Sequence, residues 1–437
     1  MSIFPAGAPP DAAAGTPKSH SRSNPMNKIS LSFLSILKYG IQGLPAEGFE
    51  DLTAGDWNSL FELAMSHKVL PLFADAVYPL PGAQEKLRQT RPFLRQQLLV
   101  QTLKTAEFLR LYQALEEAGI RPLVVKGIVC RSLYPKPDLR VSSDEDLLVP
   151  PEQFDAARRV LEDFGMEWVS TDSDANELPY RQKGGSLYIE LHRCLFPQRE
   201  EAYGDWNQLF TGAFDRAVAE NIQGVSIRTL DPTDHLFFLI SHAMKHFLHS
   251  GFGIRQVCDL VLFANAHGEQ LDWDRVTALC EQIHGLKFAA ALFRIGGKYL
   301  TFDPDRARYP ESWRAIGVDV GPLLEDLLSG GVYGTADLSR QHSSNITLEA
   351  ASGKTGKEKG VSLRGSLFPP AKKLENAYPY LKKHPWLLPA AWGQRMVKYA
   401  LETGSGGGSS ALDAVKIGRR RVELLRQYGI IDAENDG

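Results

Sequence analysis

Hydrophobic residues recur at every third or fourth position through the first quarter of the chain. This spacing is typical of helices that bury one face, and it predicts helices over residues 29–42, 55–79 and about 83–118. Residues 1–27, in contrast, are rich in proline, alanine, glycine and serine and lack an apolar segment. We expect this tail to be disordered rather than a signal peptide, and Met26 is a second candidate start of translation.

The pattern changes after residue 119, where short apolar runs are bounded by turn residues. Such runs predict strands, and Gly184-Gly185 predicts a hairpin between the last two of them. The expected strands cover residues 120–126, 144–149, 166–170, 180–183 and 186–192. The expected connections are helices at 127–133 and 152–164 and a proline-rich loop at 134–143.

Helical spacing returns at Asp231-Pro232-Thr233-Asp234, a typical helix start. Further helices are predicted over residues 234–249, 254–266, 273–284, 287–299 and 411–427, and loops over the glycine- and serine-rich stretches 330–365 and 402–410. We therefore expect a disordered tail (1–27), an N-terminal helical region (28–118), an α+β core (119–230), a helical domain (231–330) and a loop-rich segment with C-terminal helices (331–437).

Composition narrows the class of protein. The chain has 437 residues, of which 43% are hydrophobic and 23% charged, as in ordinary soluble globular proteins. A net charge of −3 gives no overall positive field that attracts nucleic acid. No apolar run is long enough to span a membrane, so we expect no membrane partner. Widely spaced cysteines predict reduced thiols of a cytoplasmic protein rather than disulfides or a zinc site: Cys130, Cys194, Cys258 and Cys280.

Two aspartates, Asp144 and Asp146, are the most informative residues of the predicted core. Side chains two positions apart in a strand point to the same face, so these carboxylates repel each other unless a cation lies between them. Mg²⁺ or Mn²⁺ suits such a pair, because these ions prefer oxygen ligands. A solvated turn before a strand is the plainer interpretation. The intervening Glu145 faces the other way, and is either exposed or paired with a basic residue.

This segment resembles the DNA polymerase β-like nucleotidyltransferase superfamily, and in particular the family called uncharacterised nucleotidyltransferases. The similarity extends over roughly residues 30–430, with weaker matches at 241–246, 271–274 and 419–425, but residues 120–195 alone carry motifs specific for chemistry. The matching residues are Lys126-Gly127, Arg140, Ser143, Asp144, Asp146, Glu190 and His192.

The resemblance implies an α+β fold: a polymerase β-like core with a small mixed sheet and flanking helices, plus N-terminal and C-terminal helical regions. It implies transfer of a nucleoside monophosphate from an NTP, ATP among the candidates, to an acceptor with two Mg²⁺ or Mn²⁺ ions. Asp144, Asp146 and Glu190 would hold the metal, and Glu190 would also act as base. Contacts to the nucleotide would come from Lys126, Gly127, Arg140, Ser143 and Lys245.

The turn departs from that of better-known relatives, because Ile128 stands where a second small residue is usual. The stretch from Gly127 to Asp144 is also longer, and we assign the excess to a loop at 134–139. Glycine permits close approach of the backbone to a phosphate, and Lys126 adds positive charge. Arg140 either binds phosphate or braces the aspartate pair.

A histidine-rich helix supplies a second group of candidates. His242, Lys245, His246 and His249 share one helical face, which we expect to border the site. His192, His242 and His246 would then lie in a second layer around the metal, whereas a plain packing role fits them equally well. Zinc binding by the His-x3-His pair lacks the accompanying glutamate of zinc hydrolases.

Weaker candidates lie further along the chain. Arg255 and Asp259 are on the next predicted helix. The run Arg419-Arg420-Arg421 is interpreted as a solvated helix face, with an RNA or phosphate contact as the alternative.

Two other functions remain open from the sequence. The core is either an active transferase or a catalytically degenerate nucleotide-binding or scaffold protein, and a phosphohydrolase built on the histidine-rich helix is a third reading. The acceptor is equally open among a small molecule, a protein side chain and an RNA end. The oligomeric state is not specified by any pattern in the chain.

Overall fold

The computed structural model describes residues 27–169, 176–198, 202–331, 344, 346–348, 350–352, 371–374, 378–394 and 411–431. The predicted disordered tail up to residue 26 and the predicted loop at 402–410 lie outside these residues. The loop prediction for 330–365 is wrong for residues 344, 346–348, 350 and 351, which are helical. Ile346 there is buried in a small apolar cluster with Val422, which explains the order.

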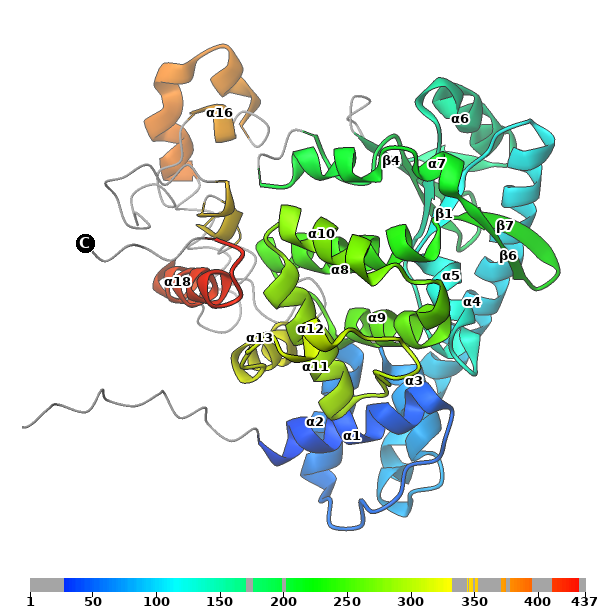
Figure 1. Ribbon diagram of the computed structural model, residues 1–437, viewed down its shortest axis with the longest axis vertical. Helices are drawn as coiled ribbons and strands as arrows, with labels where there is room; N and C mark the ends of the chain where they lie inside the picture. The colour runs from blue at the N-terminus through cyan, green and yellow to red at the C-terminus, as the bar shows by residue number, and fades with distance from the viewer. Residues whose placement is uncertain are drawn as a thin grey trace, which may run out of the picture.

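A mixed sheet of seven strands forms the core (Figure 1). Its order is β3-β4-β5-β2-β1-β7-β6, with β2 antiparallel to β1 and parallel to β5. The strands are β1 (Leu123–Val125), β2 (Glu145–Leu148), β3 (Met166–Trp168), β4 (Glu177–Gln182), β5 (Tyr188–His192), β6 (Val218–Ile222) and β7 (Val225–Thr229). The predicted α+β fold, including the β4–β5 hairpin, is confirmed.

The β6–β7 hairpin was not expected from the sequence. Its turn, Gln223-Gly224, places both residues at positive φ, as two-residue hairpin turns require. β6 buries Ile222 but alternates between partly buried and exposed positions before it, so its apolar pattern is weak. The hairpin extends the sheet beside β1, where β7 runs parallel to it.

Most predicted helices are present, but residues 55–79 form two helices instead of one, with Lys68 between them at φ +54°. Helices at residues 213–216, 311–314 and 321–330 were not predicted. In chain order the helices are α1 (Lys28–Gln42), α2 (Ala54–Ser66), α3 (Leu70–Val77), α4 (Gln84–Glu117), α5 (Gly127–Ser132), α6 (Phe154–Asp163), α7 (Ala213–Arg216), α8 (Pro232–Leu248), α9 (Ile254–His267), α10 (Trp273–Gln282), α11 (Leu286–Tyr299), α12 (Glu311–Arg314), α13 (Gly321–Gly330), α16 (Ala371–Leu374) and α18 (Ala411–Gln427). Asp231 caps α8 by accepting from the backbone of Thr233 and Asp234, as its sequence predicts.

Short 3-10 helices link several of these elements. They are η1 (Pro81–Ala83), η2 (Pro137–Leu139), η3 (Pro151–Gln153), η4 (Gly204–Phe210), η5 (Gly268–Gln270), η7 (Pro379–Lys382) and η8 (Pro385–Leu387). η2 lies in the predicted proline-rich loop before β2.

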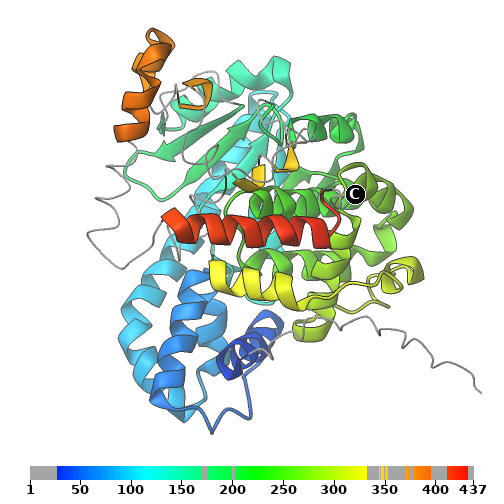
Figure 2. The ribbon, with the colours of Figure 1, turned by 90° about the vertical axis from the view of Figure 1, so that its left-hand side faces the viewer.

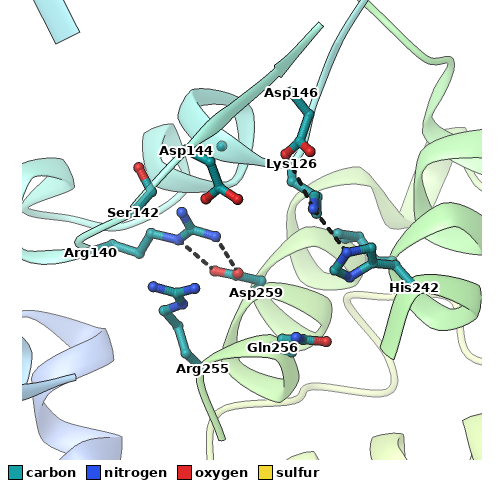
Figure 3. Close-up of a pocket in the computed structure, with 11 residues that line it drawn as sticks. Lys126, Arg140, Ser142, Asp144, Asp146, His242, Arg255, Gln256 and Asp259 are labelled. Atoms are coloured by element: carbon teal, nitrogen blue, oxygen red, sulfur yellow. Dashed lines mark hydrogen bonds and ion pairs between the residues drawn. The ribbon is translucent and has the colours of Figure 1, made fainter. Parts of the chain in front are cut away.

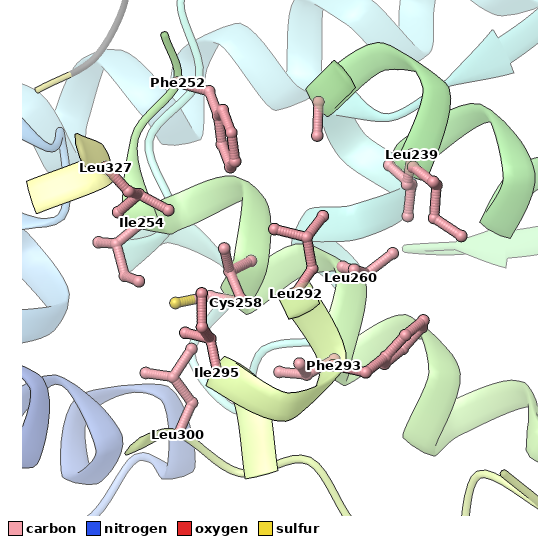
Figure 4. Packing of buried hydrophobic residues seen from close by; sticks show 14 of the residues in the cluster. Leu239, Phe252, Ile254, Cys258, Leu260, Leu292, Phe293, Ile295, Leu300 and Leu327 are labelled. Carbon is pink, nitrogen blue, oxygen red and sulfur yellow. The ribbon is translucent and has the colours of Figure 1, made fainter. Parts of the chain in front are cut away.

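The two faces of the sheet contribute to different cores. One face, with Val124 and Leu147, joins an apolar cluster with α4 and α6. The other, with Val125 and Leu148, joins a larger cluster that includes the helices after β7 and the N-terminal helices. Figure 4 shows the packing between α8, α9, α11 and α13 in that larger cluster. Period-two alternation in β2 therefore sends Glu145 toward α4 and Asp146 toward α8.

The C-terminal helix α18 lies along α13 (Figure 2). The interpretation of its basic run as a solvated face is wrong for Arg421, which is 1% exposed. The Arg421 guanidinium donates to the carbonyl oxygens of Phe247 and His249 at the end of α8. Arg419 and Arg420 are exposed, as expected.

Two sequence-based predictions, on membrane-spanning helices and on the cysteines, can be compared with the described residues. No helix among them is long and apolar enough to cross a membrane. All the cysteines named above are free, and Cys194 is the one that is not fully buried.

Candidate functional site

The turn between β1 and α5 has an unusual backbone. Lys126 adopts φ +53° and ψ −118°, a conformation that side chains rarely take and that is typical of strained functional turns. Its N–H donates to Nε2 of His235 at 3.1 Å. The other ring nitrogen of His235 contacts the hydroxyl of Thr229, which donates to the carbonyl of Val124. A hydrogen-bonded chain thus ties the turn to β7 and α8.

His235 is a residue that sequence reasoning misses. Its position near the start of α8 does not indicate a contact with a turn 109 residues earlier. Burial lowers the pKa of His235 to about 3, so the ring is neutral and can accept from Lys126.

Asp146 and Glu190 are neighbours because β2 and β5 run parallel and pair these two residues in register. His192, two residues further along β5, lies 3.1 Å from Oδ1 of Asp146 and 3.6 Å from Oε2 of Glu190. Lys126 Nζ lies 3.2 Å from Oδ2 of Asp146. The carboxylate of Asp146 is therefore held between two basic groups.

The charges in this group depend on one another. Burial raises the pKa of Asp146, but Lys126 and His192 outweigh it and hold the pKa well below its usual range. Burial lowers the pKa of His192, but the hydrogen bonds to Asp146 and Glu190 prevail and raise it to about 9. Burial, aided by the charge of Asp146, raises the pKa of Glu190 above its ordinary value. Both strand carboxylates thus lie in a setting that favours a nearby cation.

Glu145 is fully buried on the opposite face of β2, so its predicted pairing with a base is confirmed and exposure is wrong. Its carboxylate accepts from the backbone N–H of Ile128 at 2.7 Å and from Arg131 at 3.1 Å, and lies 3.6 Å from Lys104 Nζ. A Cβ on Gly127 would come within 2.0 Å of Oε2 of Glu145. Glycine is required at 127 because this carboxylate packs against its backbone.

Two cavities flank the aspartates. The larger, of about 200 Å³, is lined by Glu177, Glu190, His192, Leu195, Phe238, Lys245 and His246. The smaller, of about 30 Å³, is lined by Gly127, Arg140, Ser142, Leu239, Arg255, Gln256 and Asp259 (Figure 3). Both also contain Lys126, Asp144, Asp146 and His242. The site therefore has two chambers with the aspartates and Lys126 at their junction.

Two of the predicted nucleotide contacts have other neighbours. Ser143 is exposed and its hydroxyl donates to Oδ1 of Asp144, whereas Ser142 lines the smaller cavity. Arg140 forms two hydrogen bonds to the carboxylate of Asp259, at 3.1 and 2.6 Å (Figure 3). Arg140 is thus fixed to α9 rather than to the aspartate pair, and Asp259 has a definite partner.

The predicted histidine face of α8 does border the site. His242 Nε2 lies 2.9 Å from Lys126 Nζ and 3.1 Å from Nε2 of His246 (Figure 3 shows the first contact). Burial lowers the pKa of both histidines well below its usual range, so they are neutral. His249 is different, because its ring contacts the hydroxyl of Tyr203 at 2.6 Å.

A divalent metal fits part of the predicted ligand set. Asp146, Glu190 and His192 each offer a ligand atom, and these atoms lie within 4.8 Å of one another. Two carboxylates from adjacent strands are the oxygen donors that Mg²⁺ or Mn²⁺ prefers. Asp144 is not a member of that group in the described residues, but it lines both cavities.

Comparison with known protein families identifies one match. A family model described as uncharacterised nucleotidyltransferase matches residues 53–300. A crystal structure of an antigenic nucleotidyltransferase-like protein from Paracoccidioides brasiliensis matches with 16% identity and a TM-score of 0.27, over 46% of this chain and 95% of that one. No curated protein matches the chain.

Proposed function

Because the chain belongs to the family of uncharacterised nucleotidyltransferases, we propose that it transfers a nucleoside monophosphate from an NTP to an acceptor. The observation that carries this proposal is the register pairing of Asp146 with Glu190 beside the Lys126-Gly127 turn. A scaffold protein has no need for two carboxylates, a lysine and a strained turn to converge on one cavity.

Each residue has a role in the proposed reaction. An acceptor hydroxyl in the larger cavity attacks the α-phosphorus, its proton passes to the carboxylate of Glu190, and the bond to the β-phosphate oxygen breaks to release pyrophosphate. Lys126 and the backbone at Gly127 hold the phosphates from the smaller cavity, with Arg140 next to them. His235 acts as a positioning residue, because it fixes the turn that carries Lys126.

Asp144, Asp146 and Glu190 would hold Mg²⁺ or Mn²⁺. When bound, the metal would neutralise the triphosphate and the charge that develops in the transition state. Lys126 and His192 lie beside Asp146 and lower the pKa of its carboxyl group, so this proposed ligand is ionised. His242 and His246 would support Lys126 from α8.

Location and donor are part of the same proposal. The free and mostly buried cysteines suit the reducing cytoplasm, and ATP is among the candidate donors.

A thermal-shift experiment with ATP, GTP, CTP and UTP, each with Mg²⁺ or Mn²⁺, tests the donor site. A ligand that binds the folded state alone raises the melting temperature by mass action. We expect a metal-dependent rise of several degrees with at least one NTP, lost in the double variant Asp144→Asn/Asp146→Asn. The exposed Asp274→Asn variant removes a carboxylate elsewhere and should behave as wild type.

The outcome separates the transferase from its rivals. Circular dichroism must first show that the double variant is folded. If no NTP stabilises the wild type in either metal, the transferase proposal fails. If an NTP binds equally well without metal and to the double variant, a nucleotide-binding scaffold is favoured. Stabilisation by Zn²⁺ alone would favour a hydrolase on α8.

A further inference from the structure

The larger cavity contains a lysine for which the described part of the chain supplies no partner. Lys245 on α8 lines this cavity and is partly buried, and no described residue forms a hydrogen bond or ion pair with its ammonium. Lys126, on the same cavity, lies 3.2 Å from Asp146. An ammonium group withdrawn from water without a partner is costly, so its presence in a cavity indicates a ligand of opposite charge.

Two carboxylates lie near Lys245 in the cavity. Burial lowers the pKa of its ammonium, and the negative charges of Glu177 and Glu190 oppose that effect without forming an ion pair with it. These carboxylates are directed to other partners, since Oε2 of Glu177 lies 3.7 Å and Oε2 of Glu190 3.6 Å from His192. Lys245 therefore lines the cavity beside two carboxylates that are directed to His192 instead.

Lys245 also lies on one side of the junction between the cavities. It lines the chamber of Glu190, whereas Gly127, Arg140 and Arg255 line the other. The sequence-based assignment of Lys245 to the NTP phosphates would require it to reach across the aspartates. A contact on its own side, with the molecule whose hydroxyl meets Glu190, needs no such movement.

Arg255 strengthens the assignment of the smaller cavity to the donor. It is 7% exposed, and one of its terminal nitrogens donates to the carbonyl of Val141. Among the described residues neither its buried Nε nor the side-chain oxygen of the adjacent Gln256 has a hydrogen-bond partner. The smaller chamber thus has its own free donor for a phosphate oxygen and does not need Lys245.

We propose that the larger cavity binds the acceptor, and that the acceptor is a small hydroxyl compound bearing a carboxylate or phosphate that pairs with Lys245. This inference rests on the proposed nucleotidyl transfer. A cavity of about 200 Å³ is smaller than the roughly 300–1,000 Å³ of sites for drug-sized ligands, which favours a small molecule over a polymer end. Phe238 and Leu195 form its apolar wall.

Calorimetric titration of the full chain tests the inference. The protein is first saturated with Mg²⁺ and a non-hydrolysable α,β-methylene analogue of the NTP that binds best. Ribose 5-phosphate, ribonate and ribose are then titrated in turn, because they share hydroxyl groups but differ in charge. We expect one or both anions to bind and ribose to bind at least about tenfold more weakly, and the stronger anion distinguishes phosphate from carboxylate.

Variants separate the acceptor from the donor. Lys245→Met and Lys245→Gln should weaken anion binding at least about tenfold and leave the affinity for the NTP analogue unchanged, while Lys245→Arg keeps the charge and most of the binding. The exposed Lys183→Met is the matched control. Circular dichroism identifies any variant that does not fold. The folded variants then show whether Lys245 binds the anion.

Failure of the inference differs from failure of the proposed function. If the NTP analogue and Mg²⁺ do not bind to the wild type, both are overturned. If the analogue binds but neither anion does, or if ribose binds as well as the anions, the inference alone is overturned. If Lys245→Met weakens the analogue rather than the anions, Lys245 belongs to the donor site and the inference is wrong.

Discussion

Glu145 shows how one residue between two candidate metal ligands supports the fold instead of the chemistry. Its carboxylate lies under the turn at Gly127 and faces the cations of Lys104 and Arg131. Burial raises the pKa of Glu145, but these cations and the N–H of Ile128 prevail and lower it, so the carboxylate is charged. A buried ionic network thus supports the turn that carries Lys126.

Replacement of Glu145 by glutamine should be strongly destabilising. The side chain keeps its shape, but the positive charges of Lys104 and Arg131 lose their counter-charge in a buried position. Removing one partner of a buried ion pair typically costs roughly 3–5 kcal/mol. Urea unfolding monitored by fluorescence measures the change in the free energy of unfolding.

The matched control is Glu281→Gln on the exposed face of α10, which should change the free energy of unfolding by no more than about 0.5 kcal/mol. A loss below about 1 kcal/mol in Glu145→Gln would mean that water or another group already screens the two cations, contrary to the network described here.

The C-terminal end of α8 contacts a side chain of α18. The last carbonyl groups of a helix have no hydrogen-bond donor within that helix. Arg421 donates hydrogen bonds to two of them, the carbonyls of Phe247 and His249. Its positive charge also suits the negative end of the α8 dipole. Through this contact the C-terminal helix supports the helix that carries His242 and Lys245.

Arg421→Leu should therefore loosen α18 from α8. We expect the free energy of unfolding to fall by about 2–4 kcal/mol, because two charge-assisted hydrogen bonds are lost and the carbonyl groups remain buried. Hydrogen exchange measured by mass spectrometry should rise in both helices. The exposed Arg419→Leu should leave exchange unchanged, and equal protection in both variants would show that Arg421 does not hold the helices together.

The sequence predicts helices and strands that have one clearly apolar face. It does not predict those in which apolar and polar residues share a face. α1 follows from spacing alone, since its buried residues Phe33, Leu37 and Ile41 recur at every fourth position. The β6–β7 hairpin escapes prediction because its strands alternate weakly at the sheet edge. Periodicity likewise does not show that one arginine of the basic run in α18 meets the end of α8.

The sequence predicts the acidic residues of the candidate site but not the contacts that bring its elements together. Local spacing identifies Asp144 and Asp146, and the resemblance identifies Glu190. The register that places Asp146 opposite Glu190 depends on strand order, which no local pattern specifies. His235 and the Arg140–Asp259 pair depend on contacts more than a hundred residues apart, and such contacts are invisible to motif reasoning.

For the whole molecule, His67 connects regions that are distant in sequence. It ends α2, and its buried ring accepts from the N–H of Ile254 at the start of α9. The other ring nitrogen donates to the carbonyl of Leu328 in α13 at 3.3 Å. The N-terminal helix α2 therefore meets α9 and α13 at a neutral imidazole, beside the apolar cluster that includes Phe33 and Leu328.

This contact makes the stability of the whole chain depend on pH. Burial lowers the pKa of His67 to about 4, compared with about 6.5 in the unfolded chain. Between these values the unfolded state binds more protons, so the contribution is present above pH 6.5 and lost as the pH falls toward 4. The loss amounts to about 3 kcal/mol for this histidine alone.

His67→Gln isolates the effect, because glutamine retains a donor and an acceptor but does not titrate. Other buried histidines, such as His235 and His249, also have lowered pKa values, so both proteins lose stability in acid. The difference in unfolding free energy between wild type and variant is therefore the informative quantity. It should shrink by up to about 1.4 kcal/mol per pH unit between pH 6 and 4.5 in urea titrations, and remain constant above pH 7.5.

A difference that stays constant across the whole range would mean that the ring takes up a proton inside the folded protein as easily as outside it. The helices would then be held at this point by packing rather than by a neutral imidazole.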